Sequence, residues 1–358
     1  MMEISLATFA NALTFLGNVS ATAALSCDQD DVTWVGVVTP TNGIVRYRLG
    51  DVPIPTSGIT IDVKSLGEYA RALAGGARPQ QDNIVLSRGE GGLELRTALS
   101  HARINFAPGS PLPAASADDA APIEVDARAL RRALEGVIVA AERIGARPTL
   151  ECVLLDVAGD AAQLAAADGY RLATARLALA GDAAPMLIHW RDAQLWARWL
   201  KGRDGAATLR VGGAYAQLED DAWQLVARSR VDLKFPNYRA IIPADMPAQA
   251  RLALRSIRQL VAAAAALTDK DAPGVTLAIG AGEITVITPN VERGRAELRA
   301  EAQTIGEGAA KLAAQYLRDA LTAIDDSDVE FALAAAGQPV RVRGLSSGIA
   351  HYIMPMMR

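Results

Sequence analysis

The sequence is poor in the residue types on which most enzyme and metal sites depend. Its 358 residues include two cysteines and three histidines. His101, His189 and His351 are scattered, with no partner at the spacing of a metal site or of a nucleophile and its base, which favours structural roles. Cys27 and Cys152 lie outside any CxxC pair, so we expect two free, buried thiols. We therefore expect no metal, no cofactor and no catalytic residue.

Long apolar runs and a large excess of one charge sign are missing as well. No stretch approaches the roughly 20 apolar residues of a membrane span, and the first five residues lack the basic region of a signal peptide, which predicts a cytoplasmic protein. The formal net charge is −4. Any contact with nucleic acid would therefore require a local basic surface. No GxxxxGK[ST] phosphate loop is present, and we interpret Gly-Glu-Gly-Gly at residues 89–92 as a hairpin turn.

Helical periodicity occurs in two series that repeat along the chain. The first series covers residues 6–17, 126–141 and 252–267, whose starts lie about 120 to 126 residues apart. The second covers residues 62–74, 191–202 and 307–324. Between the two helices of each repeat, apolar and polar residues alternate as in a half-buried strand, at residues 42–49, 169–177 and 293–299. The pattern predicts an α+β fold with three copies of one unit, each with two helices packed on antiparallel sheet.

Three domains follow from this repeat, with boundaries at residues 1–120, 121–247 and 248–358. Residues 108–119 are rich in Pro, Ser and Asp, which are typical of a segment between domains. A second Pro-containing segment lies near residues 243–247. The length suits two or three domains of ordinary size. Coincidental helix spacing in an unrelated multi-helix protein is the alternative.

Three short segments carry more information than the repeat itself. Asp168 and Gly169 precede a predicted strand and form a turn in which glycine supplies the positive φ. Residues 234–239 read Lys-Phe-Pro-Asn-Tyr-Arg. The last eight residues are apolar and rich in methionine, a flexible side chain suited to surfaces that accept several partners. Pro355 would hold the tail extended. A last strand packed into the core is the alternative for this tail.

In this order and spacing, the three segments resemble the bacterial DNA polymerase III beta subunit, or beta sliding clamp, family. The resemblance is good from about residue 126 to the end and weaker before it. It implies three clamp-type domains per chain and a head-to-tail homodimer that closes as a ring. It also implies a non-catalytic processivity factor that encircles duplex DNA and tethers partners through a peptide-binding cleft. The implied partners are the replicative DNA polymerase, the clamp loader and other proteins with a clamp-binding motif.

The resemblance assigns the cleft to residues at matching positions. They are Leu150, Gly169, Tyr170, Arg171, Leu172, Pro236, Ile241, Tyr316, Tyr352, Ile353, Met354, Pro355 and Met356. Two positions depart from the family pattern. Ala167 replaces a residue that is often threonine, and Ala240 replaces an arginine, so the rim should hold acidic peptide residues less firmly.

Lysines and arginines of the predicted helices and their flanks are expected to face DNA through sequence-independent phosphate contacts. They are Lys64, Arg71, Arg128, Arg131, Arg132, Arg147, Arg191, Arg198, Lys201, Arg251, Arg255 and Arg258. Ordinary solvated helix faces are the alternative. Ala266 and Leu267 match an apolar position of the dimer interface, with simple core packing as the alternative. Residues 6–17 carry no Lys or Arg, which suggests a second function, a clamp-like adaptor that binds peptides without stably encircling DNA.

Overall fold

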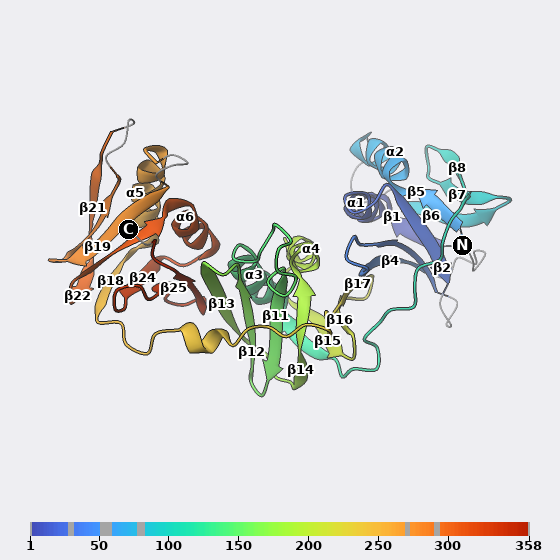
Figure 1. Ribbon diagram of the computed structural model, residues 1–358. Coiled ribbons are helices and arrows are strands. Elements are labelled where there is room, and N and C mark those ends of the chain that lie inside the picture. Colours follow the sequence, from blue (N-terminus) through green and yellow to red (C-terminus); the bar gives the residue numbers. More distant parts are fainter. Residues whose placement is uncertain are drawn as a thin grey trace. The chain divides into compact units, whose positions relative to one another are not determined.

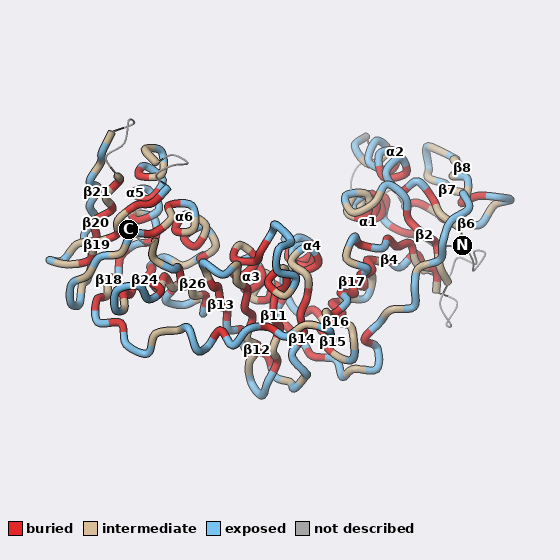
Figure 2. The backbone as a smooth tube through the Cα atoms, in the orientation of Figure 1, coloured by how far each residue is buried: buried red, intermediate tan, exposed pale blue. Residues whose placement is uncertain are grey.

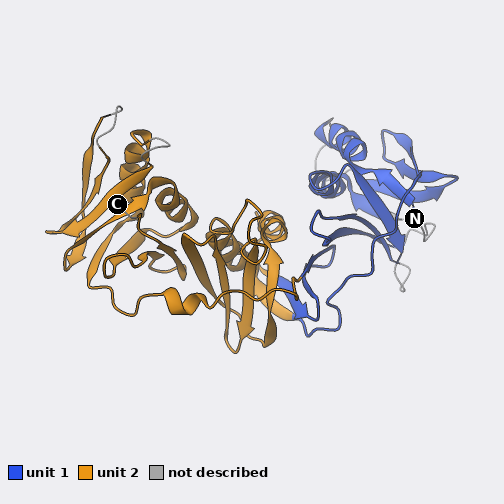
Figure 3. Ribbon diagram, viewed as in Figure 1, with its two compact units in different colours: residues 1–122, 207–228 blue, residues 123–206, 229–358 orange. Residues whose placement is uncertain are grey.

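The computed structural model describes residues 2–27, 32–50, 59–76, 83–268, 273–289 and 294–356. Arg293, Met357 and Arg358, which belong to predicted segments, lie outside these residues. The described chain divides into two compact units, residues 1–122 with 207–228 and residues 123–206 with 229–358 (Figure 3). Residues 207–228 join the first unit because β17 (Trp223–Arg228) pairs with β4 (Ile44–Gly50). The division into three domains stays a prediction.

The helices confirm the predicted α+β class and occur in three successive pairs. They are α1 (Leu6–Gly17), α2 (Val63–Gly76), α3 (Ala127–Ile138), α4 (Trp190–Leu200), α5 (Leu254–Ala266) and α6 (Ala314–Ala323). Each helix directly follows a strand (Figure 1). At α3 the change from strand to helix is fixed by Asp126, whose Oδ1 accepts a hydrogen bond of 2.7 Å from the backbone N–H of Ala129.

Two helix predictions were wrong at their beginnings. Residues 307–313 do not belong to α6, because Gly308–Ala313 form strand β23, which pairs with β19 (Gly274–Gly280). Arg251 and Leu252 do not belong to α5, because they lie in β18 (Ala248–Ala253), which pairs with β24 (Asp328–Leu333). Both segments contain alanine, a good helix former, but pairing with a neighbouring strand outweighs a propensity of a few tenths of a kcal/mol per residue.

The first unit contains two antiparallel sheets. One has the strand order β1 (Met2–Ser5), β6 (Asn83–Gly89), β7 (Gly92–Arg96) and β8 (His101–Asn105). The other runs through β15 (Ala206–Gly212), β16 (Tyr215–Glu219), β17, β4, β3 (Thr33–Val38), β2 (Thr22–Cys27), β5 (Ile59–Asp62) and β9 (Ala107–Pro108). The β6–β7 connection confirms the hairpin predicted at residues 89–92, with Gly91 at a φ of +71°.

The second unit also has two sheets. The larger has the order β14 (Ala183–His189), β11 (Cys152–Ala158), β12 (Ala161–Ala167), β13 (Arg171–Ala178), β26 (Ile349–Ile353), β25 (Val340–Gly344), β24, β18 and β22 (Gln303–Ile305). The smaller has the order β21 (Glu297–Glu301), β20 (Glu283–Ile287), β19 and β23. Strand β10 (Ile123–Asp126) precedes α3. The pairing of β13 with β26 joins the second and third repeats into one sheet.

One face of the larger sheet packs towards helices, and the other is partly covered by an extended segment. Val342, His351 and Ile353 point to the helix side and are at most 1% exposed. The covering segment, residues 233–246, contains the short 3-10 helix η1 (Tyr238–Ile241) and is here called the strap. Its Phe235, Tyr238 and Met246 pack against the opposite face of the sheet. Figure 2 shows buried backbone concentrated in the strands and on the sheet-facing sides of the helices.

Cys27 is half-buried and Cys152 is buried, and neither forms a disulfide. Burial raises the pKa of the Cys152 thiol to about 11, so this thiol stays protonated and unreactive at neutral pH. The helices of the described segments are all too short or too polar to cross a membrane.

Candidate functional site

The turn between β12 and β13 is held by its own aspartate. Asp168 Oδ1 accepts hydrogen bonds from the backbone N–H groups of Tyr170 and Arg171, at 2.9 and 3.0 Å. Gly169 adopts a φ of +88°, which confirms the predicted turn and favours glycine. The arrangement turns the Tyr170 side chain outwards, where it is 63% exposed.

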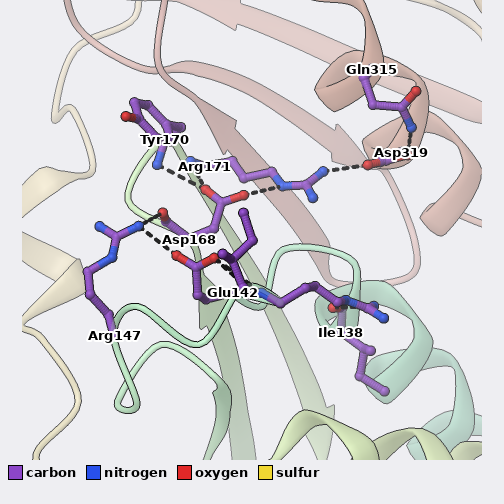
Figure 4. Close-up of polar contacts among 10 residues, drawn as sticks. Ile138, Glu142, Arg147, Asp168, Tyr170, Arg171, Gln315 and Asp319 are labelled. Carbon is purple, nitrogen blue, oxygen red and sulfur yellow. Dashed lines mark hydrogen bonds and ion pairs between the residues drawn. The ribbon is translucent and has the colours of Figure 1, made fainter.

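Arg171 connects this turn to α6. Its Nε donates to Asp168 Oδ2 at 2.9 Å, and its Nη1 donates to Asp319 Oδ2 at 2.6 Å (Figure 4). The guanidinium also lies 4.4 Å from the centre of the Tyr316 ring. With only 11% of the side chain exposed, this planar, doubly paired cation has little freedom to move. Tyr316 therefore supports the pocket through Arg171.

Arg147 holds the other side of the turn. Its Nη2 donates to Glu142 Oε2 at 2.8 Å and also to the backbone oxygen of Asp168 (Figure 4). The hydrogen bond from Arg147 lowers the pKa of Glu142, which keeps this pair ionised at neutral pH. A Cβ at Gly169 would displace the guanidinium of Arg147, which is the mobile end of a half-exposed side chain, so glycine is favoured here mainly by its φ.

These elements form one wall of an apolar pocket of about 660 Å³. The chain end forms another wall, because the backbone N–H of Met354 donates to the oxygen of Tyr170 at 2.9 Å and Tyr352 pairs with Leu172. The strap contributes Ala240 to Ala244, and the β24–β25 hairpin contributes Gly337 to Pro339. Ile241 is 52% and Met354 38% exposed, so large apolar side chains face the opening without cover from the described chain.

The structure gathers about half of the predicted cleft residues around this pocket. Those lining it are Gly169, Tyr170, Arg171, Leu172, Ile241, Tyr352 and Met354. The rest lie elsewhere. Leu150 and Ile353 are buried, Pro236 is exposed on the strap, and Tyr316 lies beneath Arg171. Pro355 and Met356 line a neighbouring hollow of about 530 Å³. The backbone N–H of Met356 donates a hydrogen bond to the backbone oxygen of Lys311.

Sequence reasoning missed part of the wall. Pro243 and Ala244 were interpreted as the start of a boundary, and Ile242, Gly337, Gln338 and Pro339 carried no motif. Proline and glycine at both places signal irregular backbone, which often forms binding sites. Only the folded sheet brings these two loops to the same opening.

A separate hollow of about 710 Å³ is lined by cationic side chains of the helices and their flanks. It is lined by five of the predicted cations, Arg131, Arg132, Arg198, Lys201 and Arg258, and by the unpredicted Arg143. The cations outnumber the two carboxylates there, Glu135 and Asp325. Among the described residues, Arg198 and Lys201 form no ion pair, whereas Arg131 pairs with Glu135 at 2.9 Å. The hollow is therefore an electropositive surface with side chains available to an anion.

The remaining predicted cations lie outside this hollow. Arg147 lies at the pocket turn, and Arg251 lies on a strand, where it pairs with Glu330. Arg128 forms an exposed ion pair with Asp204. Arg191 is in the first turn of α4, Arg255 is on α5, and Lys64 and Arg71 are on α2. Ala266 and Leu267 end α5, the first exposed and the second half-buried.

The histidines lie apart from the pocket lining. His189 caps α4, its Nδ1 accepting from the Arg191 backbone N–H at 3.1 Å, and burial lowers its pKa to about 4. His351 is fully buried, and burial together with Arg171 lowers its pKa to about 3. No cluster of metal-ligating residues occurs in the described part of the chain.

Comparison with known proteins shows which fold and which family this chain resembles. Residues 239–357 match the family model for the DNA polymerase III beta subunit, C-terminal domain. The chain is similar to the DNA polymerase III beta subunit family, and its match to the family model lies in the C-terminal domain. The beta sliding clamp of Caulobacter vibrioides is 26% identical over 323 residues, 87% of this chain and 86% of that protein. The beta sliding clamp of Escherichia coli K12 is 22% identical over 233 residues, which cover 64% of this chain and 63% of that protein.

Solved structures of this family share the fold along the whole chain. A sliding clamp from Pseudomonas aeruginosa has a TM-score of 0.84 at 19% identity, covering 100% of this chain and 99% of that chain. The beta subunit from Thermotoga maritima has a TM-score of 0.83 at 18% identity, with the same coverage. Another Pseudomonas aeruginosa structure of the family is bound to griselimycin. The fold is therefore shared along the whole chain, including the residues before 239 that the family model does not match.

Proposed function

We propose that the protein is a DNA sliding clamp, a non-catalytic processivity factor that encircles duplex DNA and tethers the replicative polymerase. The observation that carries this proposal is the apolar pocket, because the turn at Gly169, the strap at Ile241 and the tail at Met354 converge on it. Apolar surface gains roughly 25 cal/mol per Å² when it is buried, so a few anchoring side chains support a weak, exchangeable site. The clamp loader and other proteins with a clamp-binding motif would bind at the same site. The protein would act in the cytoplasm and would need no cofactor.

The hollow between the helices supports contact with DNA. Phosphate contacts by Lys and Arg are independent of sequence and allow a protein to slide. Arg198 and Lys201 are the best placed because no described side chain forms an ion pair with them. We propose that the other predicted cations contribute longer-range attraction.

A head-to-tail homodimer of three-domain chains is part of the proposal. The two smaller sheets end on β8 in the first unit and on β21 in the second. An open strand edge favours pairing with another chain. Glu297 on β21 is paired with Arg299 of the same strand, but Arg103 on β8 and Glu301 on β21 have opposite charges, which suits such pairing between two copies. Leu267 ends α5, which packs beside β21, so it would lie at the same junction.

Retention on DNA tests this function. A two-chain ring should remain on nicked circular duplex after gel filtration at high salt and should leave the same duplex once it is linearised, with clamp loader and ATP supplied for loading. Equal loss from circular and linear DNA would favour the adaptor that binds peptides without encircling DNA.

Truncation tests the pocket separately. A chain that ends at Ile353 lacks Met354, whose backbone N–H bonds to Tyr170, and it should lose measurable binding to a clamp-binding peptide from the polymerase. A chain that ends at Met356 is the matched control. Normal peptide binding by the shorter chain would contradict the assignment of the pocket.

A further inference from the structure

A buried carboxylate on the larger sheet of the second unit is surrounded by three arginines. Glu330 on β24 has a fully buried side chain. Arg251 Nε lies 2.8 Å from its Oε2, while Arg341 Nη2 and Arg343 Nε lie 2.8 and 2.7 Å from its Oε1. One carboxylate cannot neutralise three guanidinium groups, so the cluster keeps a net positive charge. Arg251 and Arg343 are half exposed, at 50% and 41%, and Arg341 is 21% exposed.

The sheet register puts this cluster on the same face as the apolar pocket. Arg341 on β25 pairs with Tyr352 on β26, and Tyr352 pairs with Leu172 on β13. Directly paired residues of antiparallel strands point to the same face, as do residues two positions apart. Arg343 therefore lies one step further along the face, opposite Glu330. Since Tyr352 and Leu172 line the pocket, Arg341 lies directly beside a lining residue, and Arg343 follows it on the same face of the sheet.

The opposite direction along this face is acidic. Arg251 shares a separate hollow with Asp328, Glu283 and Glu301. A negatively charged ligand is therefore attracted towards the side nearer Tyr352, where Arg341 and Arg343 lie. Ala240 leaves the strap side of the pocket without a cation, so these two arginines supply positive charge from the other side.

We propose that Arg341 and Arg343 bind acidic side chains that flank the apolar anchor of a peptide held in the pocket. The inference rests on the proposed function, because the pocket must hold the anchor first. An acidic peptide fits better than nucleic acid, since the arginines adjoin an apolar opening that includes Ile241, Tyr352 and Met354. Partners with acidic residues beside their anchor would then be preferred over partners with neutral ones.

The test uses peptides with one apolar anchor, Leu-Ser-Leu-Phe, and different flanks. Four Asp residues precede the anchor in one peptide and follow it in a second, and four Asn residues replace them in matched neutral peptides. Fluorescence anisotropy with the full chain at low salt should show one acidic peptide binding about five- to tenfold more tightly than its neutral match. This preference should shrink at high salt because both arginines are partly exposed.

Two variants test whether Arg341 and Arg343 cause the preference for the acidic peptide. Replacing Arg341 and Arg343 alone would leave Glu330 poorly paired and could unfold the sheet, so the test variant is R341Q/R343Q/E330Q. It should bind the neutral peptide normally and lose the preference for the acidic one. The matched control E330Q keeps both arginines and should retain or increase the preference. Thermal unfolding shows that each variant is folded.

The outcomes separate the inference from the proposed function. If the neutral peptide binds the wild type but both acidic peptides bind no more tightly, the inference is wrong and the pocket assignment stands. If no peptide binds, the proposed function itself is contradicted. If a duplex oligonucleotide binds the wild type but not the triple variant, the arginine face belongs to nucleic acid and the inference is overturned.

Discussion

At the scale of single residues, Gly169 combines a backbone requirement with a close contact to the Arg147 guanidinium. Its φ of +88° is unfavourable for a side chain, and Arg147 fills the space beside its Cα. The turn depends on both, because Arg147 also bonds to the Asp168 oxygen. A side chain added at Gly169 should therefore alter both the stability of the fold and the shape of the pocket.

We expect Gly169→Ala to lower the free energy of unfolding by roughly 1–3 kcal/mol through the positive φ and the displaced arginine. Peptide affinity should fall several-fold in isothermal titration calorimetry. Gly159→Ala is the control, because Gly159 has a φ of +65° but open space around its Cα. That variant should lose stability without losing peptide affinity. Equal effects of the two variants on peptide binding would refute this role of Gly169.

The buried histidines predict a pH dependence of stability. The folded-state pKa values are about 3 for His351 and about 4 for His189, both below the usual 6.5. As pH falls below 6.5 the unfolded chain takes up protons before the folded chain, so stability is complete above pH 6.5 and decreases towards pH 4. Each histidine contributes a slope of at most about 1.4 kcal/mol per pH unit.

Urea unfolding followed by tryptophan fluorescence at pH 7 and pH 5 measures this slope. His351→Phe should make the stability less dependent on pH. An equally steep dependence in His351→Phe and the wild type would show that His351 does not take part.

At the scale of elements, α3, α4 and α5 contribute cations to a basic surface that none of them makes alone. Arg132 and Arg258 are engaged at the end of α6, where Arg132 donates to the Asp325 oxygen and Arg258 to the Ile324 oxygen, at 2.9 and 2.6 Å. Such contacts suit cations at a helix C-terminus. Arg198 and Lys201, at the end of α4, have no such contacts with the described chain and can therefore bind an external anion.

We expect Arg198→Glu/Lys201→Glu to weaken binding to duplex DNA uniformly across sequences. Each lost phosphate contact should reduce the slope of log affinity against log salt by about 0.9, so the double variant should lose up to about two units. Arg176→Glu is a control with the same charge change per residue at an exposed strand position outside the hollow. An unchanged salt slope in the double variant would exclude the hollow from DNA contact.

At the scale of the whole molecule, the proposed dimer depends on the apolar end of α5. Leu267→Lys should shift the protein from dimer to monomer in analytical ultracentrifugation without unfolding it, because Leu267 is only half-buried within its own chain. Ala263→Lys, on an exposed position of the same helix, should leave the mass unchanged. A dimer that persists in Leu267→Lys would remove this residue from the interface.

The elements that sequence reasoning located best are those whose signal is local. The first helix was predicted at residues 6–17 and has those bounds, since its apolar residues recur on one side and are buried. The turn at Gly169 was likewise recognisable from two residues. The end of β18 and strand β23 were assigned to helices because their alanines favour a helix locally, while their pairing partners lie at least 29 residues away in sequence.

The sequence by itself determined the α+β repeat, the turn and the apolar tail, because periodicity, glycine and methionine act through neighbouring residues. Tertiary structure alone decided which residues share a surface. It brought Gly337 to Pro339 and the strap to the pocket and placed Arg341 beside Tyr352, because strand register joins segments far apart in sequence. It also moved Arg147 to the turn and Arg251 to Glu330, since an ion pair forms only when folding brings both partners together.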